Sequence, residues 1–263
     1  MLELLNVPIN DRFYDLVSSS KSSIRLCAPY VKSDVVDHIY SVKKDNTEIE
    51  YISNFNITNF HKKSSDIEAF ETISSQNDKI YNCQILHAKI YIFDDTKAII
   101  TSSNLTTSGF SRNIEYGVYI DNEDISSKIL SDFKGICHNE RTGKITARKV
   151  LEIRSILDRL PPYLNQNIDT PVISNEIDDV LDVDKEFLTI GLSDWKKAMF
   201  TAVDNINKIE FSLADVYEKE SFFTAKFPNN HTVRDSMRRN LQELRDIGLI
   251  KFLGNGKYIK LWK

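Results

Sequence analysis

The chain has 263 residues, 41% of them hydrophobic and 27% charged, which is typical of a soluble globular protein large enough for two domains. No segment is long and apolar enough to cross a bilayer, and the N-terminus lacks the basic start and apolar core of a signal peptide, so we expect a cytoplasmic protein without membrane contact. Three scattered cysteines, Cys27, Cys83 and Cys137, predict neither a disulfide framework nor a zinc cluster.

Helix and strand patterns alternate along the first half of the chain. Apolar residues at helical spacing predict helices at Asp11–Ser20, Ser33–Val42 with Ser33 as N-cap, Ser65–Ser74 and Ser126–Cys137. Strands are expected at Ser23–Tyr30, Glu48–Phe55, Tyr81–Ile85, Ala88–Phe93, Ala98–Thr101 and Asn113–Ile120. This alternation predicts an α/β domain with helices layered on a mixed sheet.

The stretch from His87 to Glu115 carries the candidate chemistry. Two adjacent predicted strands, joined by a turn that begins at Asp94, bring four polar residues to one end of the sheet: His87, Lys89, Ser102 and Asn104. A nucleophile or acid–base group, a cation, a hydroxyl and an amide donor together suit the binding and attack of a phosphate. Asp94 itself is expected to organise the local fold.

These residues resemble the HKD motif of the phospholipase D superfamily, which includes nucleases and restriction endonucleases. The matching sequence reads His87-x-Lys89-x4-Asp94, then Thr101-Ser102-x-Asn104 and Asn113-x-Glu115. The superfamily usually has glycine before the serine, whereas this chain has Thr101. The departure concerns the approach of the backbone to the phosphate and removes no catalytic side chain.

The resemblance implies catalysis by His87, with three residues holding the phosphoryl oxygens: Lys89, Ser102 and Asn104. Glu115 would hydrogen-bond a His87 ring and fix its tautomer. One imidazole cannot be nucleophile and acid at once, and the sequence contains a single His-x-Lys-x4-Asp, at His87. We therefore expect a homodimer whose two His87 side chains share one site. Because lysine and imidazolium supply the positive charge, no metal and no other cofactor are expected.

A connector follows the first domain. Thr146–Leu160 is predicted as a helix that Pro161-Pro162 ends. From Asn165 to Glu186 the chain is acidic and weakly patterned, which indicates a linker or, alternatively, an acidic strip that covers a cleft. These features divide the chain into a catalytic domain at 1–160, a linker at 161–190 and a DNA-binding domain at 191–263.

The C-terminal part is predicted to be a winged helix-turn-helix. Helices are expected at Asp194–Asn205, after the N-cap Ser212 and at Thr232–Ile247, followed by a hairpin around Gly254-Asn255-Gly256 with Lys257 at the wing. Residues 211–263 hold ten Lys and Arg against six Asp and Glu, so this part carries +4 and the rest of the chain −8. Such a division suggests a polyanionic partner.

The long C-terminal helix has a basic face. Arg234, Arg238 and Arg245 fall within one arc, where guanidinium groups suit phosphates and guanine edges, although a solvated basic face is the alternative. Ser236, Asn240 and Lys257 are further candidates for contacts with double-stranded DNA.

The C-terminal pattern also resembles the winged helix of DpnI-type restriction endonucleases. It runs from Phe211 through Asn229-Asn230-His231 to Phe252. In that family the module helps to read methylated adenine, which implies that sequence or methylation is read here. The leading hypothesis is a metal-independent restriction endonuclease; the alternatives are a phosphodiesterase acting on lipid or another substrate, and an inactive DNA-binding regulator. The recognition sequence and the cut position are not predicted.

Overall fold

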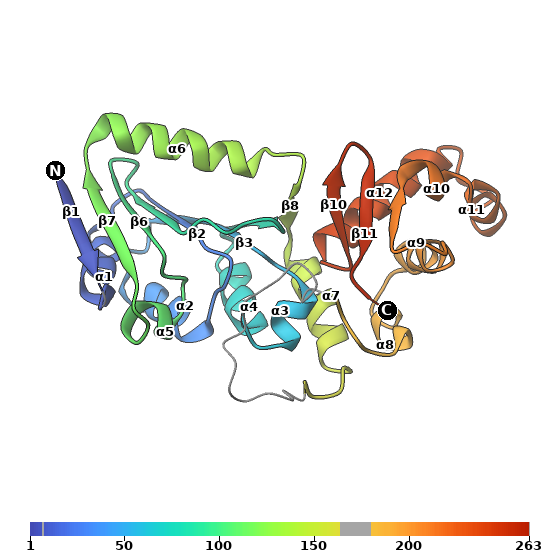
Figure 1. Ribbon diagram of the computed structural model, residues 1–263, viewed down its shortest axis with the longest axis horizontal. Helices are drawn as coiled ribbons and strands as arrows, with labels where there is room; N and C mark the ends of the chain where they lie inside the picture. The colour runs from blue at the N-terminus through green and yellow to red at the C-terminus, as the bar shows by residue number, and fades with distance from the viewer. Residues whose placement is uncertain (7, 164–179, 263) are drawn as a thin grey trace. The chain divides into compact units, whose positions relative to one another are not determined.

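The computed structural model describes residues 1–6, 8–163 and 180–262 of the chain (Figure 1). The chain divides into two compact units, the first comprising Met1–Phe55 and Lys63–Val150 and the second Asn56–Lys62 and Leu151–Lys263. Among the described residues, no helix has both the length and the apolar character needed to cross a membrane.

The first unit is built on an eight-stranded sheet with the strand order β1-β7-β6-β5-β2-β3-β4-β8. The strands are β1 (Leu2–Asn6), β2 (Ser23–Cys27), β3 (Glu48–Ser53), β4 (Lys79–Cys83), β5 (Ile90–Phe93), β6 (Lys97–Thr101), β7 (Tyr116–Asp121) and β8 (Thr142–Ile145). β2, β3 and β4 run parallel, whereas the other neighbouring pairs are antiparallel. The predicted mixed sheet is therefore confirmed.

Helices cover both faces of this sheet (Figure 1). The helices whose residues lie wholly or partly in the first unit are α1 (Asn10–Ser19), α2 (Ser33–Val42), α4 (Ile67–Ser75), α5 (Thr107–Ser111), α6 (Glu123–Cys137) and α7 (Ala147–Leu157). α6 lies alone along one face in Figure 1, where its Ile129 and Phe133 are buried with Ile92 and Ala98 of the sheet. The three cysteines, scattered in the sequence, converge on this cluster as free thiols.

Aromatic side chains fill the opposite face. Phe13 of α1 packs edge-on against Tyr91 and Phe93 of β5, with ring centroids 5.2 and 5.8 Å apart, and lies 4.7 Å from the ring of Phe110 in α5. Such pairs contribute about 0.5–1.5 kcal/mol each beyond the burial of their area. They fix α1 and α5 on the strand that follows the His-x-Lys pair.

Two details of the helices differ from the prediction. Ser33 is not the N-cap of α2, because Lys32 holds that position and Ser33 instead donates through its backbone N–H and Oγ to Asp66. Residues Ile57–His61 form a short helix, α3, whose N-cap Asn56 accepts a hydrogen bond from the backbone N–H of Asn59. A helix of five residues carries too little periodicity to be predicted.

The second unit contains a winged helix-turn-helix. Its elements are α9 (Asp194–Asp204), β9 (Glu210–Ser212), α10 (Leu213–Tyr217), α11 (Glu220–Lys226), α12 (Val233–Asp246), β10 (Ile250–Gly254) and β11 (Lys257–Lys260), with the sheet order β10-β11-β9. Ser212 and Asp215 form a reciprocal capping box at the start of α10, so the predicted N-cap is confirmed. Gly254, Asn255 and Gly256 all have positive φ and make the predicted hairpin turn.

Part of the predicted linker lies outside the described residues, namely 164–179. Within its remainder, Lys185–Thr189 forms a short helix, α8, which Asp184 caps by accepting a hydrogen bond from the backbone N–H of Glu186. Leu188 of this helix is fully buried. The domain boundaries at 160 and 190 stay a prediction.

Candidate active site and DNA-contacting surface

The motif residues meet at one edge of the eight-stranded sheet. β5 and β6 are antiparallel, and so are β6 and β7, so the start of β5, the end of β6 and the start of β7 lie at the same edge. Backbone pairing continues past the strand ends, with Thr101 N donating to Lys89 O at 3.2 Å and Ser102 N to Tyr116 O at 2.9 Å. The sheet therefore brings the His87–Lys89, Ser102–Asn104 and Glu115 segments together, as the motif spacing predicts.

Lys89 is the buried cation of this edge. Its side chain is largely enclosed, and Nζ donates to the backbone oxygen of His87 at 2.8 Å. Burial lowers the pKa of Lys89, while the negative charge of Glu115 acts in the opposite direction. The ammonium group therefore lies within electrostatic range of the Glu115 carboxylate.

Ser102 and Glu115 are joined across the β6–β7 pair. Ser102 Oγ donates to Glu115 Oε2, and it accepts the backbone N–H of Tyr116 at 3.1 Å. The other carboxylate oxygen, Oε1, accepts from Asn113 Nδ2 at 3.2 Å. Glu115 is thus held by two motif side chains of its own chain. Its predicted bond to a His87 ring stays a prediction.

Asn104 is oriented by the loop that follows β2. Its Oδ1 accepts the backbone N–H of Tyr30 at 3.3 Å, so its Nδ2 donor faces the other way. The following turn packs closely on it, since a Cβ at Gly109 would lie 2.8 Å from the backbone oxygen of Asn104. Thr106 caps α5 by accepting the N–H of Gly109 at 3.0 Å. The Tyr30 contact thus orients the amide, while the turn at Gly109 packs on the backbone of Asn104.

Thr101 occupies space that a neighbouring glycine leaves open. In the register of β6 and β7, Thr101 lies opposite Gly117, and a Cβ there would come within 2.9 Å of the Thr101 Cβ. Thr101 is buried, and its Oγ1 lies 3.0 Å from the backbone oxygen of Tyr116. The threonine that replaces the usual glycine therefore points into the domain rather than toward the exposed Ser102 side.

His87 is exposed at this edge, and within the described residues its ring has no hydrogen-bond partner. Asp94 lies at the opposite end of β5, where it accepts hydrogen bonds from the backbone N–H groups of Lys21, Ser22 and Ser23. The expectation that Asp94 organises the fold is thereby confirmed. Among the described residues, no group of three or more His, Cys, Asp and Glu side chains is arranged to hold a metal ion.

The exposed arginines of α12 lie on its N-terminal half. Arg234 is exposed, pairs with Glu220 at 2.8 Å and lies over the ring of Tyr217 at 5.2 Å from its centroid. Arg238 and Arg239 are also exposed. Arg239 was not among the predicted residues, although its neighbour was. Arg239 lies about 100° around the helix from Arg238 and so outside the arc on which the prediction was based. The pair of consecutive arginines is the sequence signal that could have found it.

The other predicted DNA-contacting side chains have partners within their own unit. Ser236 and Asn240 are buried; Ser236 Oγ accepts from Asn230 Nδ2, and Asn240 Nδ2 donates to the Ser236 backbone oxygen, both at 2.8 Å. Arg245 is largely buried and pairs with Asp246 at 2.6 Å. Lys257, exposed at the wing, lies 3.9 Å from Glu210. The arrangement favours Arg234, Arg238 and Arg239 over the buried members of the set.

Two known protein families match different parts of this chain. Residues 13–137 match the family described as "Cardiolipin synthase, PLD-like domain", and residues 192–260 match the "Dam-replacing HTH domain" of DpnI type. The chain joins a phospholipase D-like domain to a DpnI-type helix-turn-helix domain. This combination agrees with both resemblances drawn from the motifs.

Solved structures similar to the phospholipase D-like domain include three bacterial proteins. A phospholipase D family member, Nuc from Salmonella typhimurium, has 17% identity and a TM-score of 0.48, covering 56% of this chain and 98% of its own. NucT from Helicobacter pylori has 19% identity and a TM-score of 0.43, covering 52% of this chain and 94% of its own. Phosphatidylserine synthase from Haemophilus influenzae Rd KW20 has 15% identity and a TM-score of 0.43, covering 55% and 40%.

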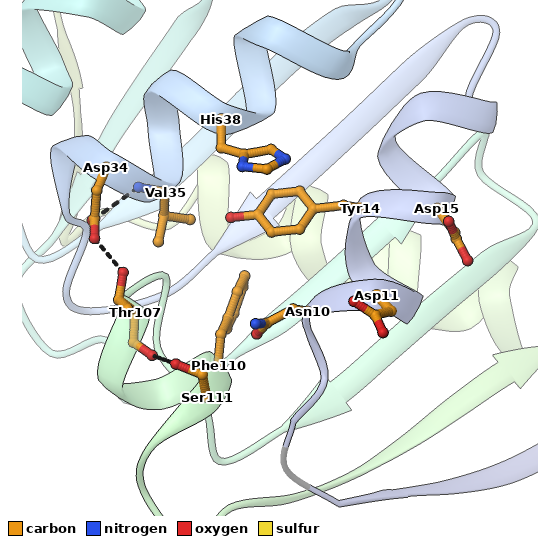
Figure 2. Close-up of a pocket in the computed structure, with 10 residues that line it drawn as sticks. All are labelled: Asn10, Asp11, Tyr14, Asp15, Asp34, Val35, His38, Thr107, Phe110 and Ser111. Carbon is orange, nitrogen blue, oxygen red and sulfur yellow. Dashed lines mark hydrogen bonds between the residues drawn. The ribbon is translucent and has the colours of Figure 1, made fainter.

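A separate cleft of about 550 Å³ lies on the aromatic side of the phospholipase D-like domain. Figure 2 shows it between α1, α2 and α5, with the rings of Tyr14 and His38 stacked 4.0 Å apart and Thr107 bonded to Asp34. The lining residues of this cleft include none of the five predicted catalytic side chains. The motif site is therefore an exposed sheet edge rather than this cleft.

Proposed function

We propose that the protein is a metal-independent endonuclease that cleaves double-stranded DNA at the motif site. The observation that supports this most directly is the shared sheet edge, where His87, Lys89 and the Ser102–Glu115 pair lie beside an oriented Asn104. The DpnI-type domain supports DNA as the substrate, because exposed arginines on its long helix suit the phosphate backbone. A restriction enzyme that reads sequence or methylation is the finer form of this proposal.

The chemistry follows from one imidazole in each subunit. A neutral His87 nitrogen attacks phosphorus and forms a P–N bond while the P–O bond to the leaving sugar oxygen breaks. The imidazolium of the partner subunit donates its proton to that oxygen. In the second half, water attacks phosphorus, the P–N bond breaks, and the now neutral imidazole of the partner accepts the proton of the water.

The groups around the imidazoles have separate tasks. In this proposal Lys89 stabilises charge on the phosphoryl oxygens and the Asn104 amide donates to them. The Ser102 hydroxyl, which donates to Glu115 in the free protein, turns to donate to the bound phosphoryl group. Glu115, which is bonded to Ser102 and Asn113, orients a His87 ring of the assembled site in this proposal. These cations and donors supply what a divalent ion supplies in other nucleases.

An apolar surface next to the motif supports pairing of two subunits. Leu4 of β1 and Ile100 of β6 both lie opposite Val118, so all three project from the same face of the sheet. Leu4 is 76% exposed, and two residues beside Glu115, Ile114 and Tyr116, are 100% and 62% exposed. Apolar side chains gathered at a site edge are typical of an interface.

The experiment that tests the function uses methylated and unmethylated plasmid, with and without EDTA. We expect discrete fragments that persist in EDTA, because the proposed mechanism needs no divalent ion. His87→Ala should bind DNA but cut it at least about 100-fold more slowly, the contribution typical of a proton-transfer or nucleophilic group. His138→Ala, a substitution of an exposed histidine at the end of α6, serves as the matched control and should cut normally.

The outcomes separate the alternatives. A mobility shift without cutting by the wild-type protein would identify a DNA-binding regulator. The description of the matched family names cardiolipin synthase, so phospholipid vesicles form a parallel assay, and turnover of lipid alone would favour a phosphodiesterase of that kind. Complete loss of cutting on chelation would refute the metal-independent mechanism.

A further inference from the structure

We propose that Tyr91 is a positioning residue that sets the geometry of Ser102 and Asn104, an inference that rests on the proposed function. Tyr91 lies on β5 two positions after Lys89, and its side chain is fully buried. Its hydroxyl donates to the backbone oxygen of Ser103 at 2.6 Å. Ser103 stands between the two residues proposed to donate to the phosphoryl group. One side chain thus connects the His-x-Lys strand to the Ser-x-Asn segment.

Thr101 holds the backbone N–H of Ser103. The backbone N–H of Ser103 donates to Thr101 Oγ1 at 3.1 Å, and the fully buried Ser103 Oγ lies 3.2 Å from that oxygen. Side chains therefore bind both the N–H and the C=O of Ser103. Because the backbone at Ser103 is fixed on both sides, the directions of the flanking Ser102 and Asn104 side chains are fixed with it.

The position of this contact explains why a hydroxyl is needed there. Pairing of β5 with β6 ends at the bond from Thr101 N to Lys89 O, so the Ser103 carbonyl lies beyond the ladder. A buried carbonyl without a donor is costly, and the Tyr91 hydroxyl supplies one. Burial raises the pKa of Tyr91 well above the ordinary value, with the charge of Glu115 acting in the same direction. The hydroxyl consequently stays protonated and donates at every working pH.

Packing of the ring does not require the hydroxyl. The edges of Phe13 and Phe110 contact the Tyr91 ring at centroid distances of 5.2 and 6.2 Å, and phenylalanine would keep these contacts. Tyr91→Phe therefore removes the hydrogen bond and little else. Tyr51→Phe is the matched control, since Tyr51 is equally buried but lies on β3 opposite Leu26 and Ile80.

The first test compares the kinetics of DNA cleavage. Tyr91→Phe should lower kcat by between about 10-fold and 100-fold, because a misplacement of 1 Å in a donor reduces transition-state stabilisation by that order. KM should change little, since the helix-turn-helix domain carries the ground-state contacts to DNA. Tyr51→Phe should leave kcat unchanged. A Tyr91→Phe enzyme with the wild-type kcat would overturn the proposal.

The second test asks whether Tyr91 acts through Asn104. In a double-mutant cycle, Tyr91→Phe should add little to the loss caused by Asn104→Ala, because both changes remove the same interaction. Losses that multiply would show a merely structural role and overturn the proposal. A titration with inorganic phosphate probes the same edge without turnover, and Tyr91→Phe should bind it about 5-fold more weakly, as expected for one lost hydrogen bond.

His87→Ala is assayed in parallel to separate the two proposals. If His87→Ala still cuts DNA, the proposed function fails, and the phosphate titration continues to decide the role of Tyr91. If His87→Ala is inactive while Tyr91→Phe matches wild type in both kcat and phosphate affinity, the inference about Tyr91 fails alone.

Discussion

Single residues at the motif edge combine exposure and burial in a way that suits phosphate chemistry. His87 is exposed and accessible to substrate, whereas Lys89, two positions later, is buried and lies near Glu115. A buried ammonium attracts a phosphoryl anion more strongly than a solvated one, since less water screens the charge. The cost of that burial is a lowered pKa, which makes the charge of Lys89 dependent on pH.

The pH dependence of cleavage should therefore report on Lys89. Lys89 is charged below its pKa, and because burial lowers that pKa, its charge is lost at a lower pH than that of an exposed lysine. Lys89→Arg keeps a charge at all working pH values. We expect the variant to be less active at its optimum but to retain its activity further into the alkaline range.

Profiles of kcat/KM against pH, each scaled to its own maximum, measure this effect. Lys128→Arg on the exposed side of α6 is the control and should follow the wild-type profile. Superimposed alkaline limbs for wild type and Lys89→Arg would show that Lys89 does not set that limb.

The sequence predicted that these residues lie at one sheet edge, but it did not predict the contacts that hold them there. His87, Lys89, Ser102 and Asn104 could be placed at one edge because strand alternation and a single turn determine their register. The bonds that orient them could not be predicted, since Tyr91 contacts Ser103 and Tyr30 contacts Asn104 through loop geometry beyond the strand ends. A buried tyrosine in a strand looks in sequence like any other core residue.

At the scale of the elements, a large side chain on one strand lies opposite a glycine on the neighbouring strand. The Thr101 side chain fills the place above Gly117, and a Cβ at position 117 would also lie 2.9 Å from the backbone oxygen of Ile100. Because that oxygen belongs to the β6–β7 ladder, it cannot move without disturbing the hydrogen bonds around it. Gly117 is therefore required by its neighbour on β6.

Gly117→Ala should destabilise the phospholipase D-like domain by about 1–3 kcal/mol, as overpacking of a rigid core does. The added methyl group clashes with Thr101 and with the Ile100 carbonyl, so Thr101→Gly should recover only part of the loss. Urea unfolding of the two single variants and the double variant measures the loss in the free energy of unfolding and its partial recovery. Simple additivity would contradict the proposed contact. Gly135→Ala, in α6 where a Cβ meets no atom within 4 Å, is the control.

The helix α12 was predicted correctly, but only some of the side chains expected on its surface are exposed. Its hydrophobic side and both ends followed from periodicity and from Gly248, which has a φ of +78°. The burial of Ser236, Asn240 and Arg245 did not follow from periodicity, because each has a local partner that a helical projection does not show. Short polar side chains at the edge of an apolar stripe commonly bind nearby backbone.

Arginine substitutions on α12 should separate DNA binding from stability. Arg238→Ala and Arg239→Ala should each weaken DNA binding and reduce the salt-dependence slope by about 1, the value for one lost phosphate contact. Arg245→Ala should instead lower the free energy of unfolding, since it leaves the largely buried Asp246 without this ion pair. Binding isotherms at several salt concentrations and urea unfolding measure the two effects. An unchanged slope for both exposed variants would place the DNA elsewhere.

At the scale of the whole molecule, one motif per chain makes subunit pairing part of the proposed mechanism. Each subunit provides one His87, and the exposed side chains of Leu4, Ile100 and Tyr116 provide an apolar surface at that edge. The expectation of pairing comes from the single complete motif in the sequence. The sequence could not predict the surface, because β1 is a short N-terminal strand whose outward leucines look like core residues.

Mixing subunits tests whether two imidazoles form one site. When equal amounts of wild-type and His87→Ala chains are refolded together, one quarter of random dimers contain two intact subunits, so activity should fall to about one quarter of that of wild type alone. Independent sites in each subunit would leave one half. Leu4→Asp should also shift the protein toward monomer in light scattering and reduce cleavage in parallel, because a charge is introduced into the proposed interface.

The chain does not assign its two compact units to two consecutive stretches. Residues Asn56–Lys62 lie early in the sequence but belong to the second unit, where Gly248 packs so tightly on Asn56 that a Cβ would lie 2.6 Å from its Cα. In that unit, His61 Nε2 also lies 2.8 Å from the backbone oxygen of Pro161. During synthesis on the ribosome, this early segment must wait for nearly two hundred further residues before its partner at Gly248 is made. Neither half of the gene, expressed alone, encodes a complete second unit.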